Sequence, residues 1–181
     1  EGVRQGDGVA QALAGVGVCG PVVTMVGSVA VLVGVGGAPL VSIRMGEEDL
    51  SAAKKVLANC FLMLIVFSVL LIGGILPFRE PMLRLFGASD ATYPYAEEYF
   101  TAYLWGTFFA LAASGLNQFI ICQGFAKKGM ASVMLGAALN IALDPVLIFA
   151  LVLGVRGAAI APVHFQAARA AFVVALPVGQ R

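Results

Sequence analysis

The chain has 181 residues, of which 60% are hydrophobic and 12% are charged, and its net charge is +1. Soluble domains carry about 25% charged residues, and the mean hydropathy here is +0.95, so the composition places the protein in a lipid bilayer. The near-neutral charge and the lack of a basic patch point away from a nucleic-acid partner. Cys19, Cys60 and Cys122 lie in apolar runs without a CxxC spacing, which is typical of buried thiols.

The first uncharged run, residues 8–43, is longer than the roughly 20 residues that cross a bilayer, and we expect a spanning helix from about residue 15 to 42. Small residues gather near the end of this run, and small residues let membrane helices approach closely. Gly36, Gly37 and Pro39 are also candidates for a hinge at which the helix bends during transport.

The next two spans follow from further uncharged runs. Residues 56–78 predict the second span, and Asp49 is a candidate N-cap for its helix. The polar connection at residues 79–98 suits a short interfacial helix. A third span is expected from about Tyr95 to Cys122.

Two more spans are expected after the turn at residues 123–129. The fourth covers residues 129–153, and a fifth begins at Ala158 but is interrupted by Pro162. All four lysines fall on one side of this arrangement, so we place the turn with Lys127 and Lys128 in the cytoplasm. The sequence therefore predicts an all-α membrane protein with about five transmembrane helices.

Asp144 is the only ionisable residue between positions 129 and 155. A carboxylate within a membrane-length segment is costly and usually faces a partner or a water-filled path. Asn140 lies one helical turn earlier, so an amide and a carboxylate share one helix face. Pro145 leaves the carbonyl of Ile141 without its usual backbone donor, which makes it a further hinge candidate. Together these groups form a candidate cation or proton site.

A second polar patch lies in the third span and consists of Ser114, Asn117 and Gln118. Amides inside membranes often hold helices together, and that structural role alone would account for the patch. The presence of Asn140 and Asp144 on the following helix favours a functional role as well. No nucleophile–base pair, Walker loop or dinucleotide motif is visible, so the sequence does not indicate an enzyme.

Five stretches in register resemble the multidrug and toxic compound extrusion (MATE) family of transporters. They are residues 36–46 with Asp49, 81–89 with Tyr95, 117–127 with Met130, 140–149 and 154–161. Their order and spacing match the family from about residue 12 to 166, which is nearly the whole chain. The specificity comes from the five stretches together, because no single one is decisive.

The resemblance implies a twelve-helix antiporter that is built from two similar six-helix lobes. Such proteins export organic, often cationic compounds or drugs in exchange for sodium ions or protons. Residues 1–181 would form a partial N-terminal lobe, helices two to six. The chain begins at Glu1 rather than at Met, and we expect it to be a piece of a longer protein.

The resemblance also assigns residues to a cation-coupling site. Asn117 matches an Asn on helix four, and Asn140 and Asp144 match an Asn and an Asp on helix five. The acid on helix one is absent from this chain, and the Thr position on helix six is occupied by Pro162. The implied coupling ion is a proton or a sodium ion at Asp144, without any other metal or cofactor.

The implied partners are the lipid bilayer, a small organic substrate, the missing first helix and the C-terminal lobe. The implied location is a cell membrane, as a multi-pass protein of the bacterial inner membrane. Two alternatives stay open. One is a truncated remnant that does not transport and only associates with membrane helices. The other is a lipid-precursor flippase of the same superfamily, whose cavity would carry several basic residues, whereas the spans here offer only Arg169.

Overall fold

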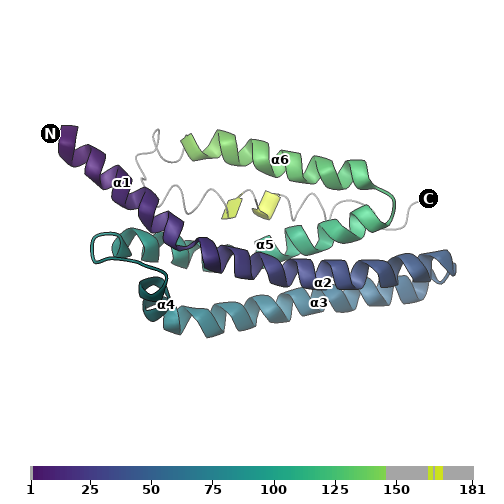
Figure 1. Ribbon diagram of the computed structural model, residues 1–181. Coiled ribbons are helices and arrows are strands. Elements are labelled where there is room, and N and C mark those ends of the chain that lie inside the picture. The colour runs from purple at the N-terminus through teal and green to yellow at the C-terminus, as the bar shows by residue number, and fades with distance from the viewer. Residues whose placement is uncertain (1, 146–162, 165, 169–181) are drawn as a thin grey trace.

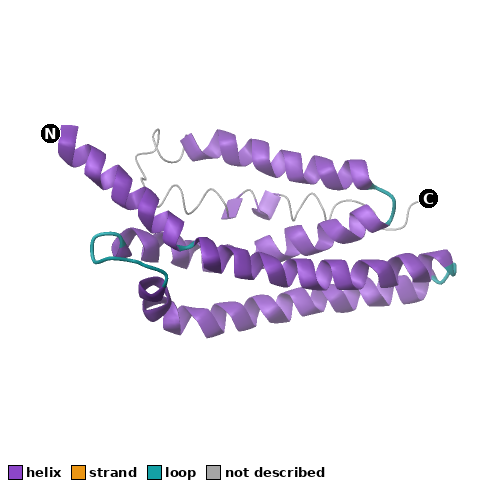
Figure 2. Ribbon diagram, in the orientation of Figure 1, coloured by secondary structure: helices purple, strands orange, loops and turns teal. Residues whose placement is uncertain are grey.

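The computed structural model describes residues 2–145, 163–164 and 166–168, and this part of the chain is built of helices without a strand (Figures 1 and 2). The helices follow one another in the order α1 (Gly2–Val18), α2 (Gly20–Gly46), α3 (Leu50–Ile75), the short 3-10 helix η1 (Leu76–Phe78), α4 (Arg79–Leu85), α5 (Tyr93–Cys122) and α6 (Ala126–Pro145). The predicted all-α class is confirmed.

Three helical segments in the described part are long and apolar enough to cross a membrane: Ala10–Gly46, Leu50–Leu85 and Tyr93–Cys122. They correspond to the first three predicted spans. The fourth predicted span begins in α6 and continues beyond the described residues, and most of the fifth lies outside them as well.

The first predicted span differs from the structure in one respect, because the helix breaks at Cys19 instead of running on from α1 into α2. Pro21 lies in the first turn of α2 and explains the break. Proline has no backbone N–H, and its ring would collide with the carbonyl oxygen four residues earlier in a continuous helix. The next helix begins as predicted, since the side chain of Asp49 accepts a 2.9 Å hydrogen bond from the Ala52 N–H.

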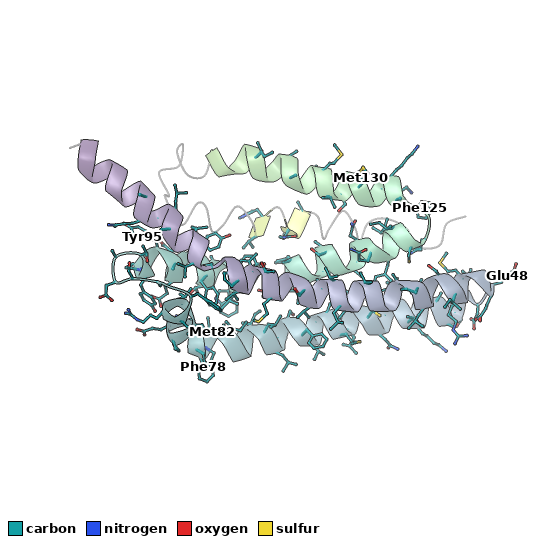
Figure 3. All side chains as sticks on the ribbon, viewed as in Figure 1. Glu48, Phe78, Met82, Tyr95, Phe125 and Met130 are labelled. Carbon is teal, nitrogen blue, oxygen red and sulfur yellow. The ribbon has the colours of Figure 1, made fainter. Side chains whose placement is uncertain are left out.

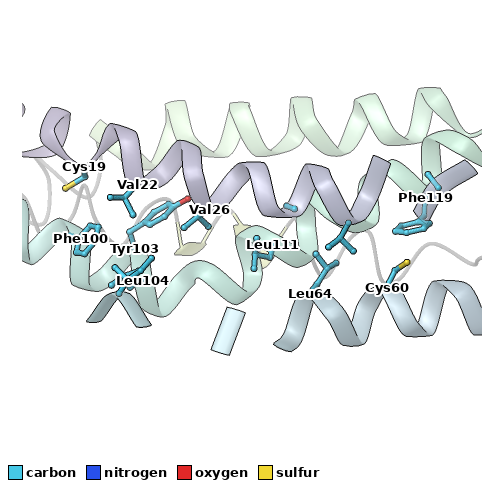
Figure 4. Packing of buried hydrophobic residues seen from close by; sticks show 14 of the residues in the cluster. Cys19, Val22, Val26, Cys60, Leu64, Phe100, Tyr103, Leu104, Leu111 and Phe119 are labelled. Carbon is cyan, nitrogen blue, oxygen red and sulfur yellow. The ribbon is translucent and has the colours of Figure 1, made fainter. Parts of the chain in front are cut away.

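The core lies where α2, α3 and α5 pack against one another (Figures 1 and 4). Its largest fully buried side chains include Phe100, Phe119, Leu64, Leu104, Leu111 and Val26. α6 packs on α5, and α1 packs on the first half of α5. α5 is therefore the central helix of the described chain.

Glycines allow the closest helix contacts. A Cβ at Gly34 would lie 2.9 Å from the carbonyl oxygen of Gly115, and one at Gly37 would lie 2.5 Å from Sγ of Cys60. Small residues thus let α2 approach both α5 and α3. α2 continues through Pro39 without a break, and the hinge role of this region stays a prediction.

The two ends of the bundle carry different turns. Glu48, in the turn between α2 and α3, and Phe125, before α6, lie at one end, whereas Phe78, Met82 and Tyr95 lie at the other (Figure 3). The lysine-bearing segments therefore share one end of the bundle, as the alternation of spans predicts.

At the opposite end, ion pairs tie α4 to the start of α5 and to the loop between them. The Arg79 guanidinium donates to Glu97 at 2.8 Å, and Arg84 contacts Glu80 at 3.2 Å and Asp90 at 2.9 Å. The short interfacial helix that was expected in this connection is α4.

Candidate functional site

Asn117 is the predicted site residue whose surroundings are best defined. It lies on α5 and is buried, with only 5% of its surface exposed. Its Oδ1 has no hydrogen-bond partner among the described residues. The same atom lies 3.5 Å from the position that a Cβ on Gly129 would take, so Asn117 points toward the first turns of α6.

Two further polar side chains, one directly after α5 and one in the first turns of α6, are buried without a partner in the described part of the chain. Ser132 on α6 is fully buried, and its Oγ is unpaired; Gln123, at the end of α5, is 7% exposed, and its Nε2 is unpaired. A buried polar group without a partner costs about 1–3 kcal/mol. Groups of this kind in a membrane protein call for water, an ion or a further polar partner.

The sequence analysis did not single out Ser132 or Gln123. Helical spacing could have found Ser132, because Gly129, Ser132, Gly136 and Asn140 recur every three or four residues and therefore lie on one face of a helix. The first three of these are buried, while Met130 on another face is 64% exposed. The buried face of α6 is therefore small and polar.

The backbones of Asn140, Asp144 and Pro145 belong to α6, which is helical as far as Pro145. The one-turn spacing between the amide and the carboxylate is therefore present in the structure. The side chains of these three residues lie outside what the structure describes.

The helix does not bring Asn117 and Asp144 to the same depth. Asn140 follows Gly129 by eleven positions and Asp144 follows it by fifteen, which at 1.5 Å per residue is about 16 Å and about 22 Å along the axis. Asn117 lies beside Gly129. A common role for the three residues in coupling stays a prediction.

The other members of the polar patch on α5 have different surroundings. Gln118 is half-buried, and its Cγ would lie 2.8 Å from a Cβ on Gly34, so its stem packs against α2. Ser114 is half-buried. Within this patch Asn117 therefore points toward α6, whereas Gln118 packs against α2.

A fourth unpaired polar atom is Oε1 of Gln166. Gln166 lies in a short helical piece of the described chain, and so does Val163, whose Cγ2 would lie 2.5 Å from a Cβ on Gly106 of α5. Because Gln166 follows Val163 by three positions, its backbone lies within about 11 Å of that of Val163. The described residues contain no group of three or more His, Cys, Asp or Glu side chains that could hold a metal ion.

The described part of the chain thus combines long apolar helices with buried, unpaired polar atoms, which is the combination expected of a protein that moves solutes across a membrane. The sequence matches the MatE family over residues 9–146, and the chain belongs to this family. The resemblance inferred from the five stretches is confirmed. Members of this family are membrane transporters and not enzymes.

Characterised relatives agree with this assignment. The multidrug export protein MepA of Staphylococcus aureus is 29% identical over 143 residues, which cover 79% of this chain and 32% of MepA. An FAD transporter of Shewanella oneidensis is 29% identical over 157 residues, which cover 83% of this chain and 34% of the transporter. The chain thus spans about a third of the length of these relatives.

Solved structures show the same helix arrangement. A multidrug resistance MATE family transporter of the MOP superfamily in an inward-facing conformation superposes with a TM-score of 0.90 at 28% identity, over 97% of this chain and 41% of that one. A MATE transporter in the bent conformation gives 0.86 at 29% identity, over 91% of this chain and 37% of that one. These coverages fit a partial lobe of a larger transporter.

Proposed function

We propose that this chain is part of the N-terminal lobe of a secondary active antiporter that exports organic, often cationic compounds in exchange for sodium ions or protons. The observation that carries the proposal is the course of α6, which is helical through Asn140 and Asp144 in a chain of the MatE family. In secondary transporters, substrate and ion sites lie near the middle of the bilayer, where polar groups interrupt apolar helices.

Asp144 is proposed as the group that binds and releases the coupling ion. Four-residue steps from the buried Gly136 lead to Asn140 and then to Asp144, so all three fall within one face of α6. An ionisable residue on a protein-facing side of a membrane helix can hold a cation or a proton, whereas the lipid side would penalise its charge. Asn140 is proposed to supply an amide oxygen next to this carboxylate.

Asn117 is proposed to act in the same coupling process, at a different depth. Its unpaired oxygen lies toward the lysine-bearing end of α6. Gly36, Gly37, Pro39 and Pro145 remain proposed hinge positions. The substrate is proposed to be an organic compound such as a drug, as the name of the MepA relative suggests.

The proposed complete protein has twelve helices, a first helix ahead of this chain and a C-terminal lobe after it, in the bacterial inner membrane. Residues 1–181 would then be one partial transmembrane lobe. The coverage of about a third of each relative supports this proposal.

The test is an efflux assay on membrane vesicles that contain the full-length protein. Wild-type and Asp144→Asn proteins are compared at equal membrane abundance under an imposed sodium or proton gradient. Because Asn keeps the size and polarity of Asp but removes its charge, the variant should insert normally and lose gradient-driven export. If the variant exports substrate at the wild-type rate, Asp144 has only a packing role. Absence of export by the wild-type protein would favour the non-transporting remnant.

A further inference from the structure

We propose that the buried polar atoms of Gln123, Asn117, Ser132 and Gln166 line a hydrated path along α6, through which the coupling cation or proton travels between the Lys127–Lys128 end of the bundle and Asp144. This proposal rests on the proposed function, because Asp144 is its inner end. Apart from Asn117, the residues that would line the path are not among those that the family resemblance assigns to the ion site.

The first argument is that these four side chains hold the buried unpaired polar atoms in the described part of the chain. A serine in a helix commonly donates its hydroxyl to the carbonyl four residues earlier. Thr24, Ser28 and Thr107 make such bonds here, whereas the Ser132 hydroxyl does not. Its hydroxyl is therefore free to bind water or an ion.

The second argument is the order of these groups along the bundle. Gln123 lies at the turn that precedes α6, and Asn117 lies six positions earlier on α5, which is about 9 Å deeper. Ser132 follows Gly129, the contact of Asn117, by three positions, which is about 4.5 Å along α6. The polar groups thus extend inward from the turn in steps of about 9 Å and about 4.5 Å along the helix axes.

The third argument concerns the inner half of the path. Gly129 lies at the level of positions 117–121 on α5, and Asn140 lies about 16 Å deeper along α6. On an antiparallel helix this is close to the level of Gly106, where Val163 contacts α5 and where Gln166 follows three positions later in the sequence. The unpaired oxygen of Gln166 is therefore placed near the depth of Asn140.

The residues between these polar groups have small side chains. On α6 the inner face continues through Gly136, and on α5 it continues through Ala113 and Ala110, all of which are buried. Further along α5, Gly106 packs directly against Val163. Bridging water is how buried polar atoms without protein partners are normally satisfied.

The chemistry of the lining fits a small cation or a proton. Amide and hydroxyl oxygens are hard ligands that suit sodium, and chains of hydroxyls, amides and water carry protons. The four side chains proposed to line the path are uncharged, so none of them would hold the ion permanently. The ion would therefore pass this segment and stop at Asp144.

The test measures whether water and small cations reach Ser132. Ser132→Cys and the control Met134→Cys are placed singly in the full-length protein, with the native cysteines replaced by alanine. Met134 lies two positions away on the same helix, but it is 65% exposed on the opposite face. Inside-out vesicles receive silver ions, a small cation that binds thiolates, and unreacted cysteines are then counted with a maleimide dye after denaturation in detergent.

The proposal predicts that silver ions block Ser132→Cys about tenfold faster than Met134→Cys, since a thiol forms its reactive thiolate only in water. Equal rates at the two positions, or no reaction at Ser132→Cys, would overturn the path. The proposed function is tested separately, and it fails if the Asp144→Asn protein still exports substrate under the ion gradient. The silver-ion result does not depend on that assay.

A functional variant adds a second readout. Ser132→Val replaces the hydroxyl by an apolar group, so export driven by the ion gradient should slow several-fold while substrate binding stays unchanged. Met134→Val is the matched control and should export at the wild-type rate. Unchanged export by Ser132→Val would contradict a path that passes this hydroxyl.

Discussion

Gly37 offers the most sharply defined test of the packing, because the neighbouring Gly36 is a natural control. A Cβ at position 37 would lie 2.5 Å from Sγ of Cys60 and 2.9 Å from Cζ of Phe119, whereas ordinary contacts are 3.4–4 Å. A Cβ at position 36 would meet nothing within 4 Å. The two glycines are adjacent on α2, so the same substitution probes a crowded and an open site.

Gly37→Ala must push α2 away from α3 and α5, because neither neighbour can retreat within the core. Overpacking of this kind costs about 1–3 kcal/mol. Gly36→Ala should be neutral or stabilising by up to about 1 kcal/mol, since alanine is the better helix former. The two variants are therefore expected to differ by about 1–4 kcal/mol in free energy of unfolding.

The assay is equilibrium unfolding of the purified full-length protein, titrated with a denaturing detergent. Adding Cys60→Ala should recover part of the loss in Gly37→Ala, because it removes the closest atom. Equal stabilities of Gly36→Ala and Gly37→Ala would refute the close approach of α2 to α3. A Gly37→Ala protein of normal stability with impaired export would instead support the hinge role.

Three further predictions follow from local contacts. Asp49→Ala should destabilise α3 by about 0.5–2 kcal/mol, whereas Asp49→Asn keeps the cap. Thermal unfolding in detergent compares the two variants, and an equal loss of stability in both would contradict the capping role. Arg79→Ala should lower the melting temperature only slightly, and by less at high salt, because the ion pair between Arg79 and Glu97 is partly exposed. A large decrease in melting temperature that does not depend on salt would contradict this weak contribution. Gly106→Ala should destabilise the protein through the Val163 contact, and Val163→Ala should restore it; failure of that rescue would place the two residues apart.

The sequence could predict most of the helices, because uncharged runs of membrane length leave few alternatives to a helix. The span from Leu50 and the one that starts at Tyr93 lie close to where these runs and the cap at Asp49 put them. The break at Cys19 was not predicted, although Pro21 is its physical cause. The apolar pattern is the same on both sides of the break, so hydropathy alone does not reveal it.

The candidate site could be predicted only in part. Asp144 stands out in the sequence because a charge in an apolar run is rare, and Asn140 follows from its spacing to that residue. Ser132 does not stand out, because serine is common in membrane helices. Its importance appears only when its burial and its unpaired hydroxyl are known. The contact between Asn117 and Gly129 depends on how α5 and α6 pack, which local sequence does not encode.

The central claim is that Asp144 couples substrate export to the movement of a cation. In an antiporter this coupling is reciprocal, so a substrate gradient must drive cation movement in the opposite direction. The decisive measurement is the flux of sodium ions or protons across proteoliposomes of the purified full-length protein when only a substrate gradient is imposed. We predict substrate-driven flux for the wild-type protein and none for Asp144→Asn at equal reconstitution. Equal cation flux in the two proteins would contradict the claim.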